Sequence, residues 1–454
     1  MEDEAKVIEP TPTSTPTPPA PQWARTLVFL WGLVTFLPTI PLILGFCCVA
    51  ESAFRYDDAE TRAAILGIAT LLAIGMGCGG FMLFQAFNKR PTKALRLPPL
   101  WAMVGGFALA LATGIGLSRV ESLVPLLGPW FVLTAAALPP LAAVAWIVDH
   151  RPGWLTRRRA GVAFSVGATG SVLLAIFLEI VAPLAFVWLL LDLGDPLLDA
   201  FERLLNLLAG GEVARALTSP GFFIALFQLA IVAPLVEEFA KSLAVVPLLR
   251  GFLPDAGGAS RRNVFLLGAA AGAGFAAVEN AIYALFSARY WSGVLLVRAL
   301  GAAVHPLGAG LAALAWHAWL HRKSGIDRRW LWGFPLAAGQ HALWNGGIVL
   351  WITLSGTAFF GTAPQETDVM GVTIAAGLLA LLALEGMGLW IVAREVSRRL
   401  DPAWTTSEEG GDHVAIQTPS LSTERAVALW AVVCLVVLLP VGLAALRIFW
   451  VGGR

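Results

Sequence analysis

Hydrophobic residues in this chain gather in long unbroken runs, and short polar segments separate the runs. A membrane-spanning helix needs about 20 mostly apolar residues, whereas a membrane β-barrel shows short alternating segments. The pattern therefore predicts an all-α, polytopic transmembrane helix bundle with about eleven spans. The expected spans are 26–50, 63–87, 101–118, 124–148, 160–193, 222–249, 264–287, 294–320, 330–354, 371–393 and 426–450.

Basic residues alternate between the loops in a way that predicts the orientation. The loops 88–100, 149–159, 250–263, 321–329 and 394–425 carry three or four Lys or Arg each, and the loops between them carry two or fewer. Loops rich in Lys and Arg stay in the cytoplasm. We therefore expect a cytoplasmic N-terminus and a C-terminus on the opposite side.

Composition agrees with a membrane protein and excludes other classes. Hydrophobic residues make up 57% of the chain and charged residues 13%, whereas soluble proteins carry about 25% charged residues. The formal net charge of +1 provides no basic field for nucleic acid. Because the composition is rich in Ala, Gly and Arg and no targeting peptide is evident, we expect a bacterial inner (cytoplasmic) membrane.

The remaining segments suggest accessory parts around a central group of spans. Residues 1–25 begin with acidic residues and a Pro/Thr tract, which predicts a disordered cytoplasmic tail. Residues 26–150 are expected to form N-terminal accessory transmembrane helices, and 371–450 C-terminal transmembrane helices with a flexible polar loop at 401–425. Apolar residues at helical spacing in 195–221 predict an amphipathic helix at the outer interface.

Ionisable residues inside spans six to nine are the most informative feature of the sequence. A charge at the bilayer centre costs about 2.5–3.5 kcal/mol, so such residues are usually functional or internally paired. Along the helix, Glu237 and Lys241 are four residues apart and Glu238 and Lys241 three, so both pairs can interact. The polar residues of these spans are Glu237, Glu238, Lys241, Glu279, Asn280, His305, His341 and Asn345.

Their depths coincide despite the alternating chain direction. Glu237, Glu279, His305 and His341 lie roughly 11–15 residues from the expected cytoplasmic ends of their spans, which is a slab of about 6 Å at 1.5 Å per residue. We therefore expect them to converge in one cavity near the midplane. In contrast, Arg298 lies in the outer third of its span, and we expect it to snorkel to the interface.

Such a cavity suits acid–base chemistry but leaves alternatives open. A glutamate can take a proton from water and return it to a leaving amine. Glutamate and histidine together can instead hold a zinc ion whose bound water attacks. Midplane Glu, Lys and His residues also build proton relays, so a proton-coupled transporter is an alternative. In a non-catalytic membrane scaffold, the charges would only pair internally.

Two motifs resemble those of a known family. The segment EEFAK fits the pattern E-E-x-x-K, FAAVE fits F-x-x-x-E, and His305 and His341 follow at suitable intervals. Over roughly residues 160–354 the chain resembles the PrsW family of intramembrane proteases, which is related to the CPBP and Rce1-type membrane proteases. The resemblance implies endoproteolysis of a membrane-embedded protein substrate, such as an anti-sigma factor.

The resemblance also implies roles for individual residues. Glu237 and Glu238 would activate water, and Glu279 would belong to the second motif. Independently of the resemblance, the positive charge of Lys241 could keep one carboxylate of the pair ionised and oriented. His305 and His341 would be the third and fourth catalytic positions, and Asn345 would stabilise an oxyanion. If zinc is the cofactor, its expected ligands are Glu279, His305 and His341.

Overall fold

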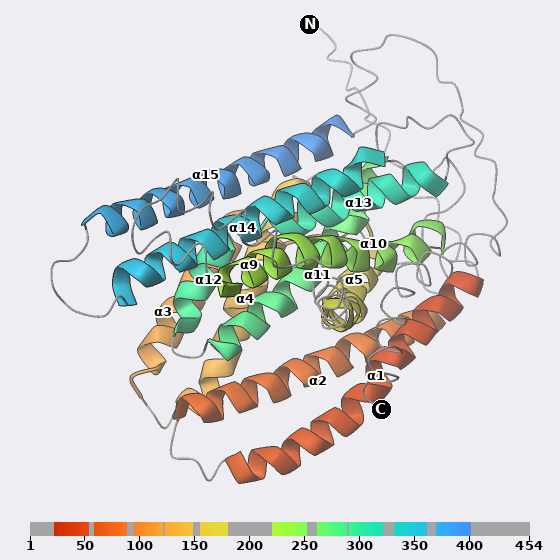
Figure 1. Cartoon of the computed structure of the whole chain (residues 1–454). Coiled ribbons are helices and arrows are strands. Elements are labelled where there is room, and N and C mark those ends of the chain that lie inside the picture. The colour runs from red at the N-terminus through yellow and green to blue at the C-terminus, as the bar shows by residue number, and fades with distance from the viewer. Residues whose placement is uncertain are drawn as a thin grey trace, which may run out of the picture.

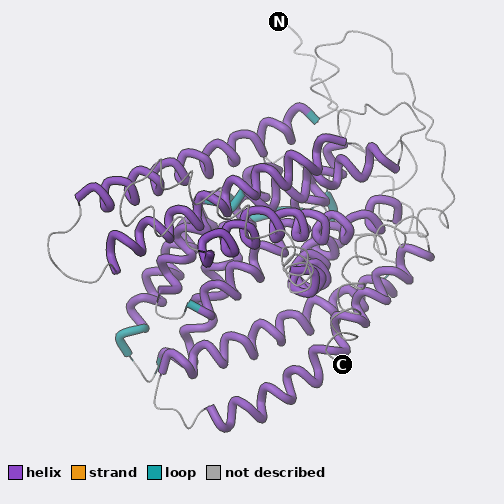
Figure 2. The backbone as a smooth tube through the Cα atoms, in the orientation of Figure 1, coloured by secondary structure: helices purple, strands orange, loops and turns teal. Residues whose placement is uncertain are grey.

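The structure is a computed structural model whose described residues are all helices and short connections. It describes residues 22–53, 59–88, 95–120, 123–148, 155–179, 220–251, 261–287, 290–320, 331–360 and 369–400. No strand occurs within these ranges (Figure 2), so the predicted all-α class is confirmed there.

The helices follow the apolar runs of the sequence. They are α1 (Gln22–Ala53), α2 (Ala59–Phe87), α3 (Leu100–Leu117), α4 (Val124–Val148), α5 (Arg157–Val166), α9 (Pro220–Phe227), α10 (Ala233–Gly251), α11 (Arg261–Phe286), α12 (Trp291–Leu300), α13 (Val304–Leu320), α14 (Gly333–Phe360) and α15 (Val369–Arg399). Two π-helical turns, η1 (Gly167–Ser171) and η2 (Gln228–Val232), follow α5 and precede α10. Such turns add a residue to a helical turn and often lie near functional sites.

The described helices confirm the prediction of a protein with several membrane spans. Among the described residues, seven helices are long and apolar enough to span a membrane, or eight if the bent pair α12–α13 forms one span. α10 and α14 coincide with two further expected spans but are not in that count. The total of eleven spans and the side of the N-terminus stay predictions.

Several expected segments lie outside the described residues. They are most of the tail 1–25, most of the amphipathic segment 195–221, the polar loop 401–425 and the last expected span, 426–450.

α11 is the central helix of the bundle. It packs against α4, α5, α10 and α13, and it is the most buried of the candidate spans. Figure 1 shows α14 and α15 on one side of this core and α1 and α2 on the other. The N-terminal helices therefore cover the core directly, through the contacts of α4 and α2 with α11.

Small residues let α11 and α13 come together closely. A Cβ atom on Gly272 would lie 2.2 Å from the carbonyl oxygen of His305, so only glycine fits there. The span that contains His305 is broken: α12 and α13 meet at an angle of 44° across residues 301–303. A Cβ on Gly301 would collide with the Trp344 ring of α14 at 2.3 Å. These contacts fix the start of α13, where His305 lies.

Candidate active site

Four adjacent helices bring the predicted ionisable residues together. Glu237, Glu238 and Lys241 lie on α10, Glu279 on α11, His305 in the first turn of α13 and His341 on α14. Close packing joins every pair of these four helices except α11 and α14. We call the group the polar cluster; its members are Glu237, Glu238, Lys241, Glu279, Arg298, His305 and His341.

Lys241 lies between both glutamates of the first motif. Its Nζ donates to Glu237 Oε2 and to Glu238 Oε1, both at 2.9 Å, as the helical spacing predicted. The same Nζ lies 2.6 Å from His305 Nδ1 and 4.2 Å from the centroid of the Phe275 ring. The side chain of Lys241 is fully buried, and its charge is compensated by two carboxylates. A buried ammonium is tolerated only with such partners.

Each histidine is held on its outer side by a carboxylate. Glu279 Oε2 lies 2.9 Å from His305 Nε2, and Glu238 Oε1 lies 3.0 Å from His341 Nδ1. A carboxylate accepts hydrogen bonds, so these contacts assign the proton of a neutral imidazole to the outer nitrogen of each ring. The inner nitrogens, His305 Nδ1 and His341 Nε2, are then left with lone pairs.

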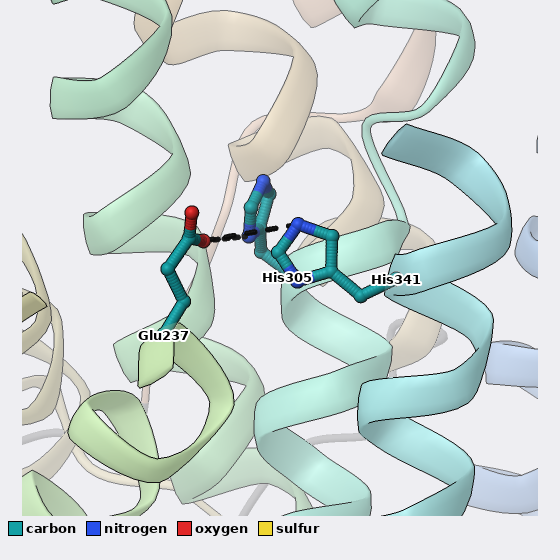
Figure 3. Close-up of side chains that lie close together, drawn as sticks. All are labelled: Glu237, His305 and His341. Carbon is teal, nitrogen blue, oxygen red and sulfur yellow. Dashed lines mark ion pairs between the residues drawn. The ribbon is translucent and has the colours of Figure 1, made fainter. Parts of the chain in front are cut away.

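Both inner nitrogens point at the same carboxylate oxygen. Glu237 Oε2 lies 3.7 Å from His305 Nδ1 and 3.7 Å from His341 Nε2 (Figure 3). The two imidazole rings meet edge to face, with centroids 4.7 Å apart. All three side chains are buried, with 1–5% of each exposed.

The chemistry of these three residues fits a divalent metal. One atom from each of Glu237, His305 and His341 lies within 4.8 Å of the other two. Two imidazoles and one carboxylate form a common catalytic zinc set, and carboxylates behind the histidines are its usual support. Lys241 Nζ contacts two of the three donor atoms, so this ammonium would have to move away from His305 Nδ1 when an ion binds. The expected zinc set contained Glu279, whose Oε2 lies 2.9 Å from the outer nitrogen of His305, and this ligand set stays a prediction.

Arg298 corrects an expectation from the sequence. Rather than snorkelling to the interface, it turns into the polar cluster, where its Nη2 donates to Glu279 Oε2 at 2.6 Å. Only 12% of its side chain is exposed. The signal in the sequence was its position seven residues before His305, two helical turns away. The break between α12 and α13 also turns this part of the span, which a continuous helix would not predict.

Two other polar residues lie beside the cluster. Glu179 follows η1, and its backbone oxygen accepts a hydrogen bond from Gln228 Nε2 of η2 at 3.3 Å. Asn345 was predicted to act in the site. Its Nδ2 donates to the Leu229 carbonyl oxygen of η2 at 2.9 Å, joining α14 to that π-helical turn, and its role in the site stays a prediction.

The comparisons with known proteins identify the region that holds the cluster. Residues 156–381 match the model of a family described as PrsW family intramembrane metalloprotease. The comparisons with curated proteins and with solved structures gave no match. Every residue of the polar cluster lies inside the matched range. The chain is therefore a peptidase whose residues 156–381 are similar to the PrsW family of intramembrane metalloproteases.

Proposed function

We propose that this peptidase hydrolyses a peptide bond of a membrane-embedded protein, with water activated beside Glu237. The observation that carries the proposal is the convergence of Glu237 Oε2, His305 Nδ1 and His341 Nε2 at distances of 3.7 Å. Three buried polar groups that face one another in a helix bundle are costly to maintain for packing alone.

Glu237 is the residue best placed to move a proton. Its Oε2 faces the space between the two imidazoles. We assign to Glu237 the transfer of a proton from water to the leaving amine, which is the usual work of a general base and acid.

Glu238 and Glu279 are positioning residues in this proposal. Each binds the outer nitrogen of one histidine and is itself bound by a cation: Lys241 binds Glu238, and Arg298 binds Glu279. The two carboxylate–histidine pairs hold both rings with their lone pairs turned inward.

The inward lone pairs favour a metal-dependent site. Neutral histidines in these tautomers cannot donate hydrogen bonds to an oxyanion from their inner nitrogens. They can bind an ion, and the family is described as a metalloprotease. If an ion binds, Glu237, His305 and His341 would hold it, and Glu237 would then act as a ligand instead of carrying the proton. A zinc ion bound there would act as a Lewis acid and lower the pKa of a coordinated water. Lys241 supplies N–H donors beside the same space.

The proposal is tested by comparing membranes that contain either the wild-type or the Glu237→Gln protein. New protein N-termini in the membrane fraction are labelled chemically and identified by mass spectrometry. We expect a set of N-termini inside or beside transmembrane segments that is present with wild type and lost with Glu237→Gln. The matched control is Glu395→Gln, because Glu395 is an exposed residue of α15 that pairs with Arg399. Identical N-termini with wild type and Glu237→Gln at equal abundance would refute the assignment.

A further inference from the structure

Helix α4 lies outside the matched family region, and a proline in it leaves a backbone carbonyl free to bind a residue next to the site. Pro140 lies inside α4 and has no backbone N–H. The carbonyl of Ala136, four residues earlier, is therefore left without its usual helical donor. Asn280 of α11 supplies one, since its Nδ2 donates to Ala136 O at 3.1 Å. Both residues are buried, so this bond satisfies two polar groups that water cannot reach.

The other end of Asn280 binds Arg298. The Arg298 Nε donates to Asn280 Oδ1, and its guanidinium lies over the Tyr283 ring at 4.8 Å. These two contacts direct Nη2 toward Glu279 Oε2, at 2.6 Å, and place it 3.3 Å from His305 Nε2. A guanidinium has five donors in one rigid plane, so fixing one edge fixes the others.

We propose that Arg298 is a positioning residue of the peptidase, and that α4 supports it through Asn280. Arg298 holds Glu279 against the outer nitrogen of His305 and so keeps His305 Nδ1 turned toward Glu237. This inference rests on the proposed function, because it assigns His305 to the site. It also gives the N-terminal helices a task, since Ala136 and Pro140 lie outside residues 156–381.

The first experiment separates positioning from packing. Purified Arg298→Met and Arg298→Lys proteins are compared with wild type on a cleaved membrane substrate. We expect Arg298→Met to lower kcat about 10–100-fold, as loss of an outer partner of a histidine does, with KM unchanged. Arg298→Lys should recover part of kcat, because a lysine can still pair with Glu279. Unchanged kcat in Arg298→Met, or a change in KM alone, would overturn the proposal.

A double-variant comparison tests whether Arg298 acts through Glu279. If it does, Arg298→Met should lower kcat much less in a Glu279→Gln background than in wild type. Equal losses in both backgrounds would show that Arg298 acts independently of Glu279, and would overturn the proposal.

Two adjacent prolines test the contribution of α4. Pro140→Ala restores an N–H that competes with Asn280 for Ala136 O, whereas Pro139→Ala restores one toward Ala135. We expect kcat to be lower in Pro140→Ala than in Pro139→Ala at similar melting temperature. Equal kcat values would overturn the role of α4.

A readout that needs no catalysis separates this inference from the proposed function. ¹⁵N NMR of histidine-labelled protein in nanodiscs reports which ring nitrogen of His305 carries the proton, with His305→Gln identifying its signals. We expect protonated Nε2 in wild type and a changed His305 pattern in Arg298→Met, with the His341 signals retained. An unchanged His305 pattern would overturn the positioning role. A wild-type protein without peptidase activity but with the expected His305 change would instead refute the proposed function alone.

Discussion

At the scale of single residues, the two glutamates of the EEFAK segment have different surroundings despite being neighbours. Glu238 Oε1 is bound by both Lys241 and His341, and no part of its side chain is exposed. Glu237 instead faces the two inner nitrogens of the histidines. The structure therefore separates a carboxylate that faces both histidines from one that binds the outer nitrogen of a single histidine.

This difference predicts unequal effects of two matched substitutions. Glu237→Gln should lower kcat by about 10²–10⁴-fold, the usual contribution of a general base. Glu238→Gln should lower it about 10–100-fold, because it weakens the support of His341 and the ion pair with Lys241 but leaves Glu237 in place. Single-turnover cleavage by the two purified proteins at equal concentration measures both values. A larger loss for Glu238→Gln would exchange the two roles.

Metal content is a second prediction at the residue scale. Purified wild type should hold about one zinc ion per chain, measured by elemental analysis after dialysis, because His2Glu is a common catalytic zinc set. His341→Ala should remove the ion, and Glu279→Gln should only weaken zinc binding, by about 10–100-fold. If instead Glu279→Gln removes the ion and Glu237→Gln retains it, Glu279 is the ligand, as the sequence first indicated.

The sequence predicted which residues meet but not how they face. Helical spacing predicted that Lys241 would contact Glu237 and Glu238, and it does. Equal depth predicted the meeting of four spans. The orientation of each imidazole depends on rotamers and on helix rotation, which spacing does not define. Arg298 was missed because its direction depends on a bend and on the side-chain oxygen of Asn280 on another helix.

At the scale of helices, the contact between α11 and α13 determines where His305 stands. Gly272→Ala should therefore lower activity and stability together, because the new Cβ would meet the His305 carbonyl at 2.2 Å and backbone cannot yield cheaply. Overpacking of this kind costs about 1–3 kcal/mol. Thermal unfolding in detergent and cleavage rate measure the two effects.

Gly105→Ala provides the control for that prediction. Gly105 lies inside α3, and a Cβ there would meet nothing within 4 Å. Alanine is favoured over glycine in a helix by about 0.5–1 kcal/mol, so this variant should be as stable as wild type or more so. A stable, active Gly272→Ala protein would mean that α11 and α13 are not held so close.

Helix boundaries were predictable where apolar runs end in polar loops. α4 and α11 fall within a few residues of their expected limits. The expected span 294–320 instead became two helices with a 44° bend, because Gly301 packs against Trp344 and the chain turns there. A hydropathy pattern shows how long an apolar segment is, but it does not show which residue of another helix the segment packs against.

At the scale of the whole molecule, the charge of the loops predicts which side each helix end faces. Asn88 ends α2 next to the basic loop 88–100, and Ser118 ends α3 at the loop before α4. Because basic loops stay in the cytoplasm, we expect residue 88 inside and residue 118 outside. Single cysteines placed at these positions, with the native cysteines replaced by serine, report the side through an impermeant thiol reagent.

The expected result in intact cells is labelling of Ser118→Cys and not of Asn88→Cys, with both labelled after the membrane is opened. The two positions are separated by one helix, α3, so they must give opposite results if α3 spans the membrane. The reverse result would invert the orientation of every helix while leaving the polar cluster intact. Labelling of both positions in intact cells would instead mean that α3 does not span the membrane. The alternation of loops between the two sides of the membrane, which the loop charges predict, would then be wrong.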